Sequence, residues 1–333
     1  MTGGGGFLGS YVVRALLKAG HEVVSYQRRP NCELQKAGAE VAQGNLLDSV
    51  ALNSAMAGCR AVIHIAAMAG VWGSREDYFS VNVGGTKSVL RGMEEEGIEK
   101  LVYCSSPSVV FSGTEFEGAD ERLPYGTNWT FAYPESKAVA EELVMEWGRS
   151  GKGKVIALRP HLIWGVGDPH LFPSIIQRAK ASRLRVIGNG RNRVDHTRVE
   201  NAAAAHVLAL EALDKPSAVN RAYFISQGDS DNLWDWVNSL LCRLDIPPVT
   251  RRIPYGLAHS AGFMCELLWK LAGKSEVPPM TRFVAQAMAK SHWFSIEAAR
   301  EELGYRPEMF PTEEGLDAYA QAWREERTPL TGP

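Results

Sequence analysis

A tyrosine and a lysine four positions apart are the side chains of this sequence best suited to moving a proton. The segment Tyr133-Pro134-Glu135-Ser136-Lys137 places the pair on one face of a predicted helix. A phenol has a pKa of about 10 and exchanges its proton poorly at neutral pH. A nearby ammonium group stabilises the phenolate, so we expect Lys137 to lower the pKa of Tyr133. The pair predicts a general acid or base, although this spacing alone is a weak signal among ten tyrosines.

Serines follow a predicted buried strand, residues 100–104, at the point where that strand ends. In doubly wound folds the carboxyl ends of parallel strands carry the ligands. A serine hydroxyl there can hold and polarise a substrate oxygen while Tyr133 transfers the proton. We assign this role to Ser106. Ser105 and Ser108 stay as alternatives, because the catalytic context is the sole guide.

Glycines at the start of the chain, Gly3, Gly6 and Gly9, fit the pattern G-x-x-G-x-x-G. Glycine is needed where the backbone turns tightly, approaches a pyrophosphate closely and starts a helix packed on a sheet. The N–H groups of the first helical turn, which includes Phe7 and Leu8, then face the anion. The alternative is a flexible glycine-rich terminus. It is disfavoured because an amphipathic helical pattern and a strand follow directly.

The end of the strand predicted at residues 22–26 decides between NAD and NADP. An acidic side chain there would hydrogen-bond the 2′-hydroxyl of the adenosine ribose. The sequence instead reads Gln27-Arg28-Arg29, without a carboxylate. Two guanidinium groups can hold a 2′-phosphate in bidentate fashion, so we expect NADP(H) as the cofactor. The alternative is a pair of solvated surface arginines.

The elements that must position these side chains are short β-branched runs alternating with longer helical patterns. Such alternation is typical of βαβ units and a parallel sheet. Strands are predicted at residues 22–26, 40–43, 61–65, 100–104 and 155–158. The clearest helices are predicted at 7–19, 78–96 and 133–149.

The predicted fold class is α/β, a Rossmann-type doubly wound parallel sheet with a smaller mixed C-terminal substrate-binding domain. The second half is less regular, with proline pairs at Pro247-Pro248 and Pro278-Pro279. We expect an NADP-binding domain over residues 1–165 and a substrate-binding region over 166–333, interleaved with the first.

A strand normally precedes the glycine turn, and here it is largely missing. We expect either a mis-assigned start or a truncation, with a cost in cofactor affinity.

Composition excludes several classes of function. A net charge of −2 gives no electrostatic case for nucleic acid or for an anionic membrane. Five scattered cysteines form neither a disulfide framework nor a zinc motif, which predicts reduced thiols in the cytoplasm. No apolar run reaches the roughly 18 residues of a membrane span.

The stretch 257–272 is predicted to be an amphipathic helix. Its apolar face is expected in the core or an interface, with the lining of a lipid pocket as the alternative.

Histidines near strand ends could suggest a metal site or an acid–base role. His64, His161 and His196 have no ligand spacing, however, so we expect hydrogen-bonding or packing roles and no metal.

The motifs together resemble the extended short-chain dehydrogenases/reductases. The resemblance rests on TGGGGFLG, SSPSVVF, YPESK and Arg159-Pro160-His161-Leu162-Ile163-Trp164-Gly165, and it covers nearly the whole chain. The stretches IGNGRNRVDHTRVENAAAAH and HWFSIEAAREELGYRP resemble the 3β-hydroxysteroid dehydrogenase/isomerase branch. AAMAGVWGS and CELLW are similar to the 2-alkyl-3-oxoalkanoate reductases of bacterial olefin biosynthesis within it.

This resemblance implies roles for further residues. Asn45 and Leu46 fall where the family has an Asp and an apolar residue beside the adenine; Asn45 departs from that pattern but can still hydrogen-bond. Ala66 and Ala67 would line the cofactor path, and Pro160 would lie near the nicotinamide. Ser106, Tyr133 and Lys137 become the catalytic residues, and the last two also contact the cofactor.

The resemblance implies reduction of a 3-oxo group on a hydrophobic substrate, most specifically a 2-alkyl-3-oxoalkanoate, by a cytoplasmic enzyme of lipid metabolism. Alternatives are a 3β-hydroxysteroid or sterol-carboxylate dehydrogenase, a sugar-nucleotide epimerase, and a non-catalytic NADP-sensing protein. The expected partners are a long-chain 3-oxo acid or sterol-like molecule, a second subunit and other enzymes of the pathway. Nucleic acid and a membrane span are not expected.

Overall fold

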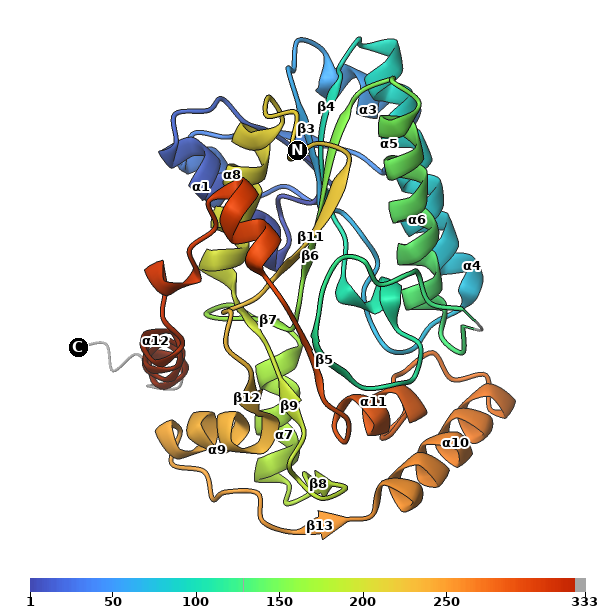
Figure 1. Cartoon of the computed structure of the whole chain (residues 1–333), viewed down its shortest axis with the longest axis vertical. Coiled ribbons are helices and arrows are strands. Elements are labelled where there is room, and N and C mark those ends of the chain that lie inside the picture. The colour runs from blue at the N-terminus through green and yellow to red at the C-terminus, as the bar shows by residue number, and fades with distance from the viewer. Residues whose placement is uncertain (128, 327–333) are drawn as a thin grey trace, which may run out of the picture.

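The structure, a computed structural model, describes residues 1–127 and 129–326. Its main sheet is parallel, and its strands run in the spatial order β2, β1, Thr2, β3, β4, β6, β11 (Figure 1). The strand bounds are β1 Val24–Gln27, β2 Glu40–Gln43, β3 Val62–His64, β4 Lys100–Cys104, β6 Lys154–Pro160 and β11 Arg221–Ile225. The order runs outward in both directions from Thr2. The predicted doubly wound fold is therefore confirmed.

Met1 and Thr2 occupy the centre of this sheet. The N–H of Thr2 donates to the carbonyl of Ile63 (2.9 Å), and the N–H of Tyr26 donates to the carbonyl of Met1 (2.8 Å). Thr2 forms parallel bridges to both β1 and β3 and is 2% exposed. A strand was expected to be largely missing at this position. Met1 and Thr2 instead make backbone hydrogen bonds to both β1 and β3 there.

Helices cover both faces of the main sheet (Figure 1). One layer contains α1 (Phe7–Lys18), α2 (Cys32–Lys36) and α8 (Val199–Ala212), whose apolar side chains share one core with β4 and β6. The buried residues of α8 include Ala202, Ala205 and Ala209, and these small side chains let α8 pack closely on α1. The opposite layer contains α3 (Ser49–Met56), α5 (Gly85–Glu95) and α6 (Ala132–Arg149) and has its own core.

A smaller mixed region lies at the carboxyl end of the main sheet. Its sheet has the order β12, β9, β14, β5, with both parallel and antiparallel pairs. Trp164 stacks on Phe172 in its core, and the Trp236 ring packs against both at steeper angles. The expected smaller C-terminal region is confirmed. The boundary near residue 165 stays a proposal, because β11 returns to the main sheet beside β6.

The remaining bounds complete the element order. The strands are β5 Phe116–Ala119, β7 Ile163–Trp164, β8 Val186–Ile187, β9 Arg193–Val194, β10 Thr197–Arg198, β12 Asp231–Asn232, β13 Arg252–Ile253 and β14 His292–Phe294. The helices are α4 Arg75–Tyr78, α7 Leu171–Lys180, α9 Leu233–Arg243, α10 Tyr255–Leu271, α11 Arg282–Ala287 and α12 Thr312–Glu325. Short turns of other helix types lie at η1 Phe79–Gly84, η2 Pro107–Val110, η3 Ala299–Leu303 and η4 Pro307–Met309.

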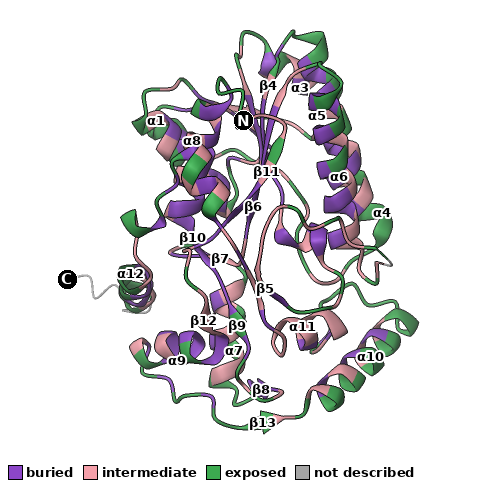
Figure 2. Cartoon of the chain, viewed as in Figure 1, coloured by how far each residue is buried: buried purple, intermediate pink, exposed green. Residues whose placement is uncertain are grey.

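Two predicted helices differ from the structure. The continuous helix expected at 78–96 is divided, because a π-helical segment, η1, separates α4 from α5. The helix expected at 257–272 exists as α10, but apart from Ala258, which is buried against Ile187 and Ala285, its large apolar side chains are not in a core. Many are exposed along its length (Figure 2). Among the described residues, no helix is long and apolar enough to cross a membrane.

Candidate active site

The glycine turn lies where the sheet order reverses, directly after Thr2. A Cβ on Gly9 would fall 2.0 Å from the carbonyl oxygen of Gly3, and Gly3 itself has a φ of +77°. Both positions therefore require glycine sterically and conformationally. Gly6 precedes α1 without a side-chain cap, and the first turn carries no acidic residue. The leading N–H groups of α1, at Phe7 and Leu8 among others, are left for an outside acceptor.

This turn fits the pyrophosphate of a dinucleotide. An uncapped helix N-terminus presents N–H donors and the positive end of the helix dipole to an anion. Ala66 lies against the turn, because its N–H donates to Thr2 Oγ1 (3.3 Å) and its nitrogen would be 2.7 Å from a Cβ on Gly3. Ala67 follows and is exposed. The structure brings the glycine turn and the end of β3 together, as the sequence predicted.

Arg28 and Arg29 extend from the end of β1 and are both exposed. Neither forms an ion pair with another described residue. Gln27 is buried. Its amide accepts from Ser25 Oγ (2.9 Å), donates to the carbonyl of Arg29 (2.8 Å), and lies beside Gly5 of the turn. The backbone of Arg29 is thus tied to Gln27 beside the glycine turn, and both arginine side chains are exposed.

Asn45 and Leu46 lie in the loop after β2. The Asn45 Oδ1 accepts from the N–H of Leu47 (3.1 Å), and its carbonyl accepts from the hydroxyl of Tyr26 (2.8 Å). Leu46 packs against Gly85, the first residue of α5. Asn45 therefore shapes a turn, and Leu46 lies against the start of α5.

Lys137 is buried on α6 and points to the end of β4. Its ammonium donates to the Tyr103 hydroxyl (2.9 Å) and to the carbonyl of Cys104 (2.7 Å). Burial lowers the pKa of Lys137 to about 8. Its positive charge also acts on His64, whose side chain is hydrogen-bonded to Thr2. Lys137 therefore lies at the end of β4, close enough to His64 for its charge to act on that ring.

Tyr133 lies in the first turn of α6. Burial raises its pKa to about 12, while side-chain hydrogen bonding with Ser106 and Ser108 opposes that increase. The prediction that Lys137 lowers the pKa of Tyr133 is therefore wrong for the protein without a bound cofactor. The reason is that the ammonium group of Lys137 is directed to Tyr103 and Cys104 instead.

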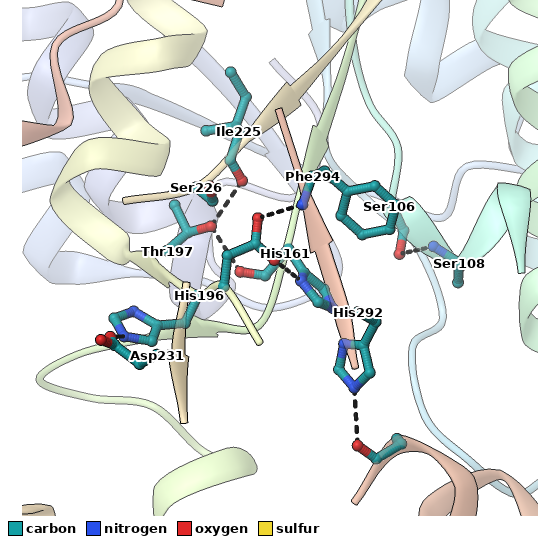
Figure 3. Close-up of polar contacts among 12 residues, drawn as sticks. Ser106, Ser108, His161, His196, Thr197, Ile225, Ser226, Asp231, His292 and Phe294 are labelled. Atoms are coloured by element: carbon teal, nitrogen blue, oxygen red, sulfur yellow. Dashed lines mark hydrogen bonds and ion pairs between the residues drawn. The ribbon is translucent and has the colours of Figure 1, made fainter. Parts of the chain in front are cut away.

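Ser106 caps η2, the short helical turn after β4. Its Oγ accepts from the N–H of Ser108 (3.2 Å), as Figure 3 shows. Ser105 is buried, and its N–H pairs with Leu158 of β6 (2.6 Å), which directs its side chain differently from that of Ser106. The interaction of Tyr133 with Ser106 favours Ser106 for the serine role, with Ser108 as the nearest alternative.

Asn82 is a site residue that the sequence reasoning missed. It lies in the π-helical segment η1 and is buried. Its Nδ2 donates to Ser136 Oγ (2.9 Å) and to the Met68 carbonyl (3.0 Å), while its Oδ1 accepts from the N–H of Met68 (2.7 Å). Asn82 thereby ties the loop after β3 to α6 between Tyr133 and Lys137. An asparagine in the middle of a predicted helix was the available signal.

His161 and Asp195 form a second polar pair at this end of the sheet. His161 follows Pro160, the last residue of β6, and its Nδ1 lies 2.5 Å from Asp195 Oδ1. The other carboxylate oxygen of Asp195 accepts from the N–H of Phe294 (3.1 Å). Figure 3 draws His161 beside Phe294 and His292, and the ring centroids of the two histidines are 5.0 Å apart.

The hydrogen-bonding roles expected for the histidines are confirmed. His64 lies between Thr2 Oγ1 (2.7 Å) and Thr86 Oγ1 (3.1 Å). His196 accepts from Trp164 Nε1. Figure 3 shows its contact with Asp231. In residues 1–127 and 129–326, no group of three or more His, Cys, Asp or Glu side chains is arranged to hold a metal ion.

A phenol, an ammonium group and a serine at one edge of a doubly wound sheet, beside its glycine turn, are the arrangement of the short-chain dehydrogenases/reductases. The chain is an oxidoreductase of that type. Residues 1–254 match the 3-beta hydroxysteroid dehydrogenase/isomerase family, and the chain belongs to it.

Several characterised proteins are similar over nearly the full length. A 2-alkyl-3-oxoalkanoate reductase from Stenotrophomonas maltophilia is 43% identical, over 95% of this chain and 96% of that protein. A second, from Shewanella oneidensis, is 39% identical over 95% and 84%. The sterol-4-alpha-carboxylate 3-dehydrogenase of Mus musculus is 31% identical over 97% and 90%.

Solved structures of lower identity share the fold. A UDP-glucose 4-epimerase has a TM-score of 0.75 at 20% identity, over 98% of this chain and 97% of that chain. A UDP-glucuronic acid 4-epimerase from Bacillus cereus, solved in complex with NAD, also has a TM-score of 0.75, at 19% identity over 98% of both chains.

Proposed function

We propose that this protein is an NADP(H)-dependent reductase that converts the 3-oxo group of a 2-alkyl-3-oxoalkanoate to a 3-hydroxy group. The observation that carries the proposal is the difference in similarity among its relatives. The two 2-alkyl-3-oxoalkanoate reductases are 43% and 39% identical, whereas the murine sterol dehydrogenase is 31% identical. The full-length match includes the region that forms the smaller C-terminal part of the fold.

The proposed cofactor is NADP(H). The glycine turn at Gly3, Gly6 and Gly9 would hold the pyrophosphate, with Ala66 beside it. Arg28 and Arg29 are exposed, have no acidic partner among the described residues, and extend from the strand end where the adenosine ribose binds in such folds. Two guanidinium groups there favour a 2′-phosphate over a 2′-hydroxyl.

The side chains divide the reaction between them. When bound, the reduced nicotinamide supplies a hydride to the ketone carbon. Tyr133 is protonated at neutral pH and donates its phenolic proton to the carbonyl oxygen as a general acid. The Ser106 hydroxyl donates a hydrogen bond to the same oxygen and so holds it toward Tyr133. Lys137, whose ammonium group is held at the end of β4 by Tyr103 and Cys104, would bind the ribose hydroxyls of the cofactor.

The direct test incubates the protein with a long-chain 2-alkyl-3-oxo acid and either NADPH or NADH. We expect loss of absorbance at the nicotinamide band with NADPH, and a 3-hydroxy acid by mass spectrometry. Deuterium from nicotinamide-deuterated NADPH should appear at C3 of the product. If NADPH is not consumed with this substrate, the substrate assignment is wrong.

A 3β-hydroxysteroid or sterol-carboxylate dehydrogenase is the second candidate, because relatives of both kinds are 31% identical over most of the chain. Oxidation of a 3β-hydroxysteroid would raise the NAD(P)H absorbance. A steroid-dependent rise without turnover of the 3-oxo acid would favour this candidate.

We further propose a homodimer formed through α5 and α6, and a location in the cytoplasm, where the five free cysteines would stay reduced. Light scattering coupled to gel filtration tests the dimer, since a single-chain mass would contradict it. Association with other enzymes of the same pathway is tested by co-purification.

A further inference from the structure

Helix α10 is attached to the protein along one side. The buried residues of that side are Ala258, Gly262 and Glu266. Gly262 lets α11 approach, because a Cβ there would fall 2.7 Å from the backbone nitrogen of Arg282. The Glu266 carboxylate accepts from the backbone N–H of Arg282 (2.7 Å) and pairs with its guanidinium group (2.7 Å). A close backbone contact and a partly buried ion pair thus fix how the helix presents its other side.

The opposite side of α10 is apolar and exposed. Figure 2 shows exposed residues along the helix at the edge of the molecule. The residues that define this α10 apolar face are Leu257 (62% exposed), Phe263 (47%), Met264 (50%), Leu267 (41%), Leu268 (53%) and Leu271 (77%). At about 100° per residue they share an arc of roughly 140°. Among the described residues, large exposed hydrophobic side chains concentrate here instead of being scattered singly, which marks a contact surface.

The charges beside this face have one sign. Between Arg251 and Lys274 the exposed ionisable side chains are Arg251, Arg252, Lys270 and Lys274. The one acidic residue of that stretch, Glu266, is buried against Arg282. The next exposed carboxylate along the chain is Glu276, in the loop beyond the helix. The face therefore combines an apolar arc with basic residues at both ends of the helix.

Two tryptophans fix the C-terminal end of α10. The indole N–H of Trp72 donates to the carbonyl of Lys274 (3.2 Å), which joins the loop after β3 to the end of α10. The Lys274 ammonium lies 4.8 Å from the centre of the Trp269 ring. Trp269 itself is on the attached side of the helix, where its indole Nε1 is buried, so the contact places the Lys274 charge at the C-terminal end of α10.

We propose that α10 lies in the plane of an anionic lipid surface, with its apolar face among the acyl chains and its basic residues at the headgroups. A second copy of this chain fits less well, because a symmetric contact would bring the two basic sets together without acidic partners. An anionic lipid supplies both the apolar phase and the opposite charge. The proposal does not depend on which substrate the enzyme reduces.

The experiment measures cosedimentation of the full chain with vesicles. One set contains phosphatidylcholine alone, and the other contains equal parts of phosphatidylcholine and phosphatidylglycerol. We expect the protein to pellet with the anionic vesicles, and to do so less at high salt. Lys270→Gln should weaken that binding roughly five-fold, which is the equivalent of about 1 kcal/mol per basic residue. It should leave any binding to neutral vesicles unchanged.

A paired variant tests the apolar face. Leu268→Asp with Leu271→Asp should abolish binding, whereas the matched change Met309→Asp, at a side chain 66% exposed away from α10, should not alter it. Because these side chains are exposed, the circular dichroism spectra and the NADPH-dependent activity in vesicle-free buffer should match those of the unaltered chain. The proposal is overturned if the unaltered chain fails to pellet with anionic vesicles. It is equally overturned if Leu268→Asp with Leu271→Asp dissociates a dimer while vesicle binding is absent.

Discussion

The ammonium of Lys137 lies 2.9 Å from the hydroxyl oxygen of Tyr103, a residue of the strand that ends at the proposed serine. A second bond to the Cys104 carbonyl fixes the same ammonium group at the carboxyl end of β4. Two acceptors on one strand hold the long side chain of Lys137 in a single direction. The catalytic lysine is thereby oriented by the sheet before any cofactor binds.

The first prediction concerns the pH dependence of activity. Burial lowers the pKa of Lys137 to about 8, so its charged form predominates below that pH and is lost above it. Tyr133, with a pKa raised to about 12, stays protonated over the same range. We expect kcat/KM for NADPH to fall as the pH rises through about 8. Lys137→Arg keeps the charge, and its profile should lack that alkaline fall even if its activity is lower. An unchanged alkaline fall in Lys137→Arg would assign the titration to another group.

The second prediction concerns the general acid. Tyr133→Phe removes the proton donor and should lower kcat by roughly 10²–10⁴-fold. NADPH affinity, measured by fluorescence titration, should change little, because the ring and the glycine turn remain. Tyr78→Phe is the matched control, since the Tyr78 ring lies 6.0 Å from that of Tyr133 and its hydroxyl bonds the Trp72 carbonyl. Tyr78→Phe should cost less than Tyr133→Phe, and equal losses would argue against a general-acid role.

The third prediction concerns cofactor choice. Arg28→Ala with Arg29→Ala removes the two cations proposed to hold the 2′-phosphate. We expect the KM for NADPH to rise by at least ten-fold, because charge-assisted hydrogen bonds contribute roughly 1.5–3 kcal/mol each. The KM for NADH should stay nearly constant, and Arg60→Ala, an exposed arginine before β3, should change neither. Parallel losses with both cofactors would show that the arginines do not read the 2′-phosphate.

Features that local sequence patterns determine, such as strand ends and motif spacing, could be predicted well. Strands β2 and β4 have the predicted ends, and α6 begins one residue before its predicted start. The glycine turn and the Tyr133–Lys137 pair were identifiable because their spacing reflects one loop and one helical turn.

Features set by contacts between distant residues were not predictable in the same way. Asn82, in the π-helical segment, is hydrogen-bonded to Ser136, 54 positions away. The pKa of Tyr133 depends on burial and on the direction of Lys137, neither of which a linear motif records. The exposure of α10 likewise depends on what the fold leaves uncovered, so the amphipathic pattern alone indicated a core or an interface instead.

The fourth prediction concerns stability and starts from Glu141 on α6 and Arg159 on β6. Both side chains are buried, and the guanidinium group contacts both carboxylate oxygens, at 3.1 Å from Nε and 2.5 Å from Nη2. The Tyr125 hydroxyl adds a bond to the same carboxylate (3.1 Å). The pair therefore ties α6, which carries the proposed catalytic tyrosine and lysine, to the strand that ends at Pro160.

Glu141→Leu leaves the Arg159 charge buried without its partner and should lower the free energy of unfolding by about 3–5 kcal/mol. Glu141→Leu with Arg159→Met replaces both charges by apolar groups and should recover much of that loss. The exposed pair Glu33–Lys36 is the control, and Glu33→Gln should cost less than about 1 kcal/mol. Urea titration followed by tryptophan fluorescence measures all three variants. A double variant no more stable than Glu141→Leu would show that the loss comes from packing around the pair, because an unpaired charge is absent from that protein.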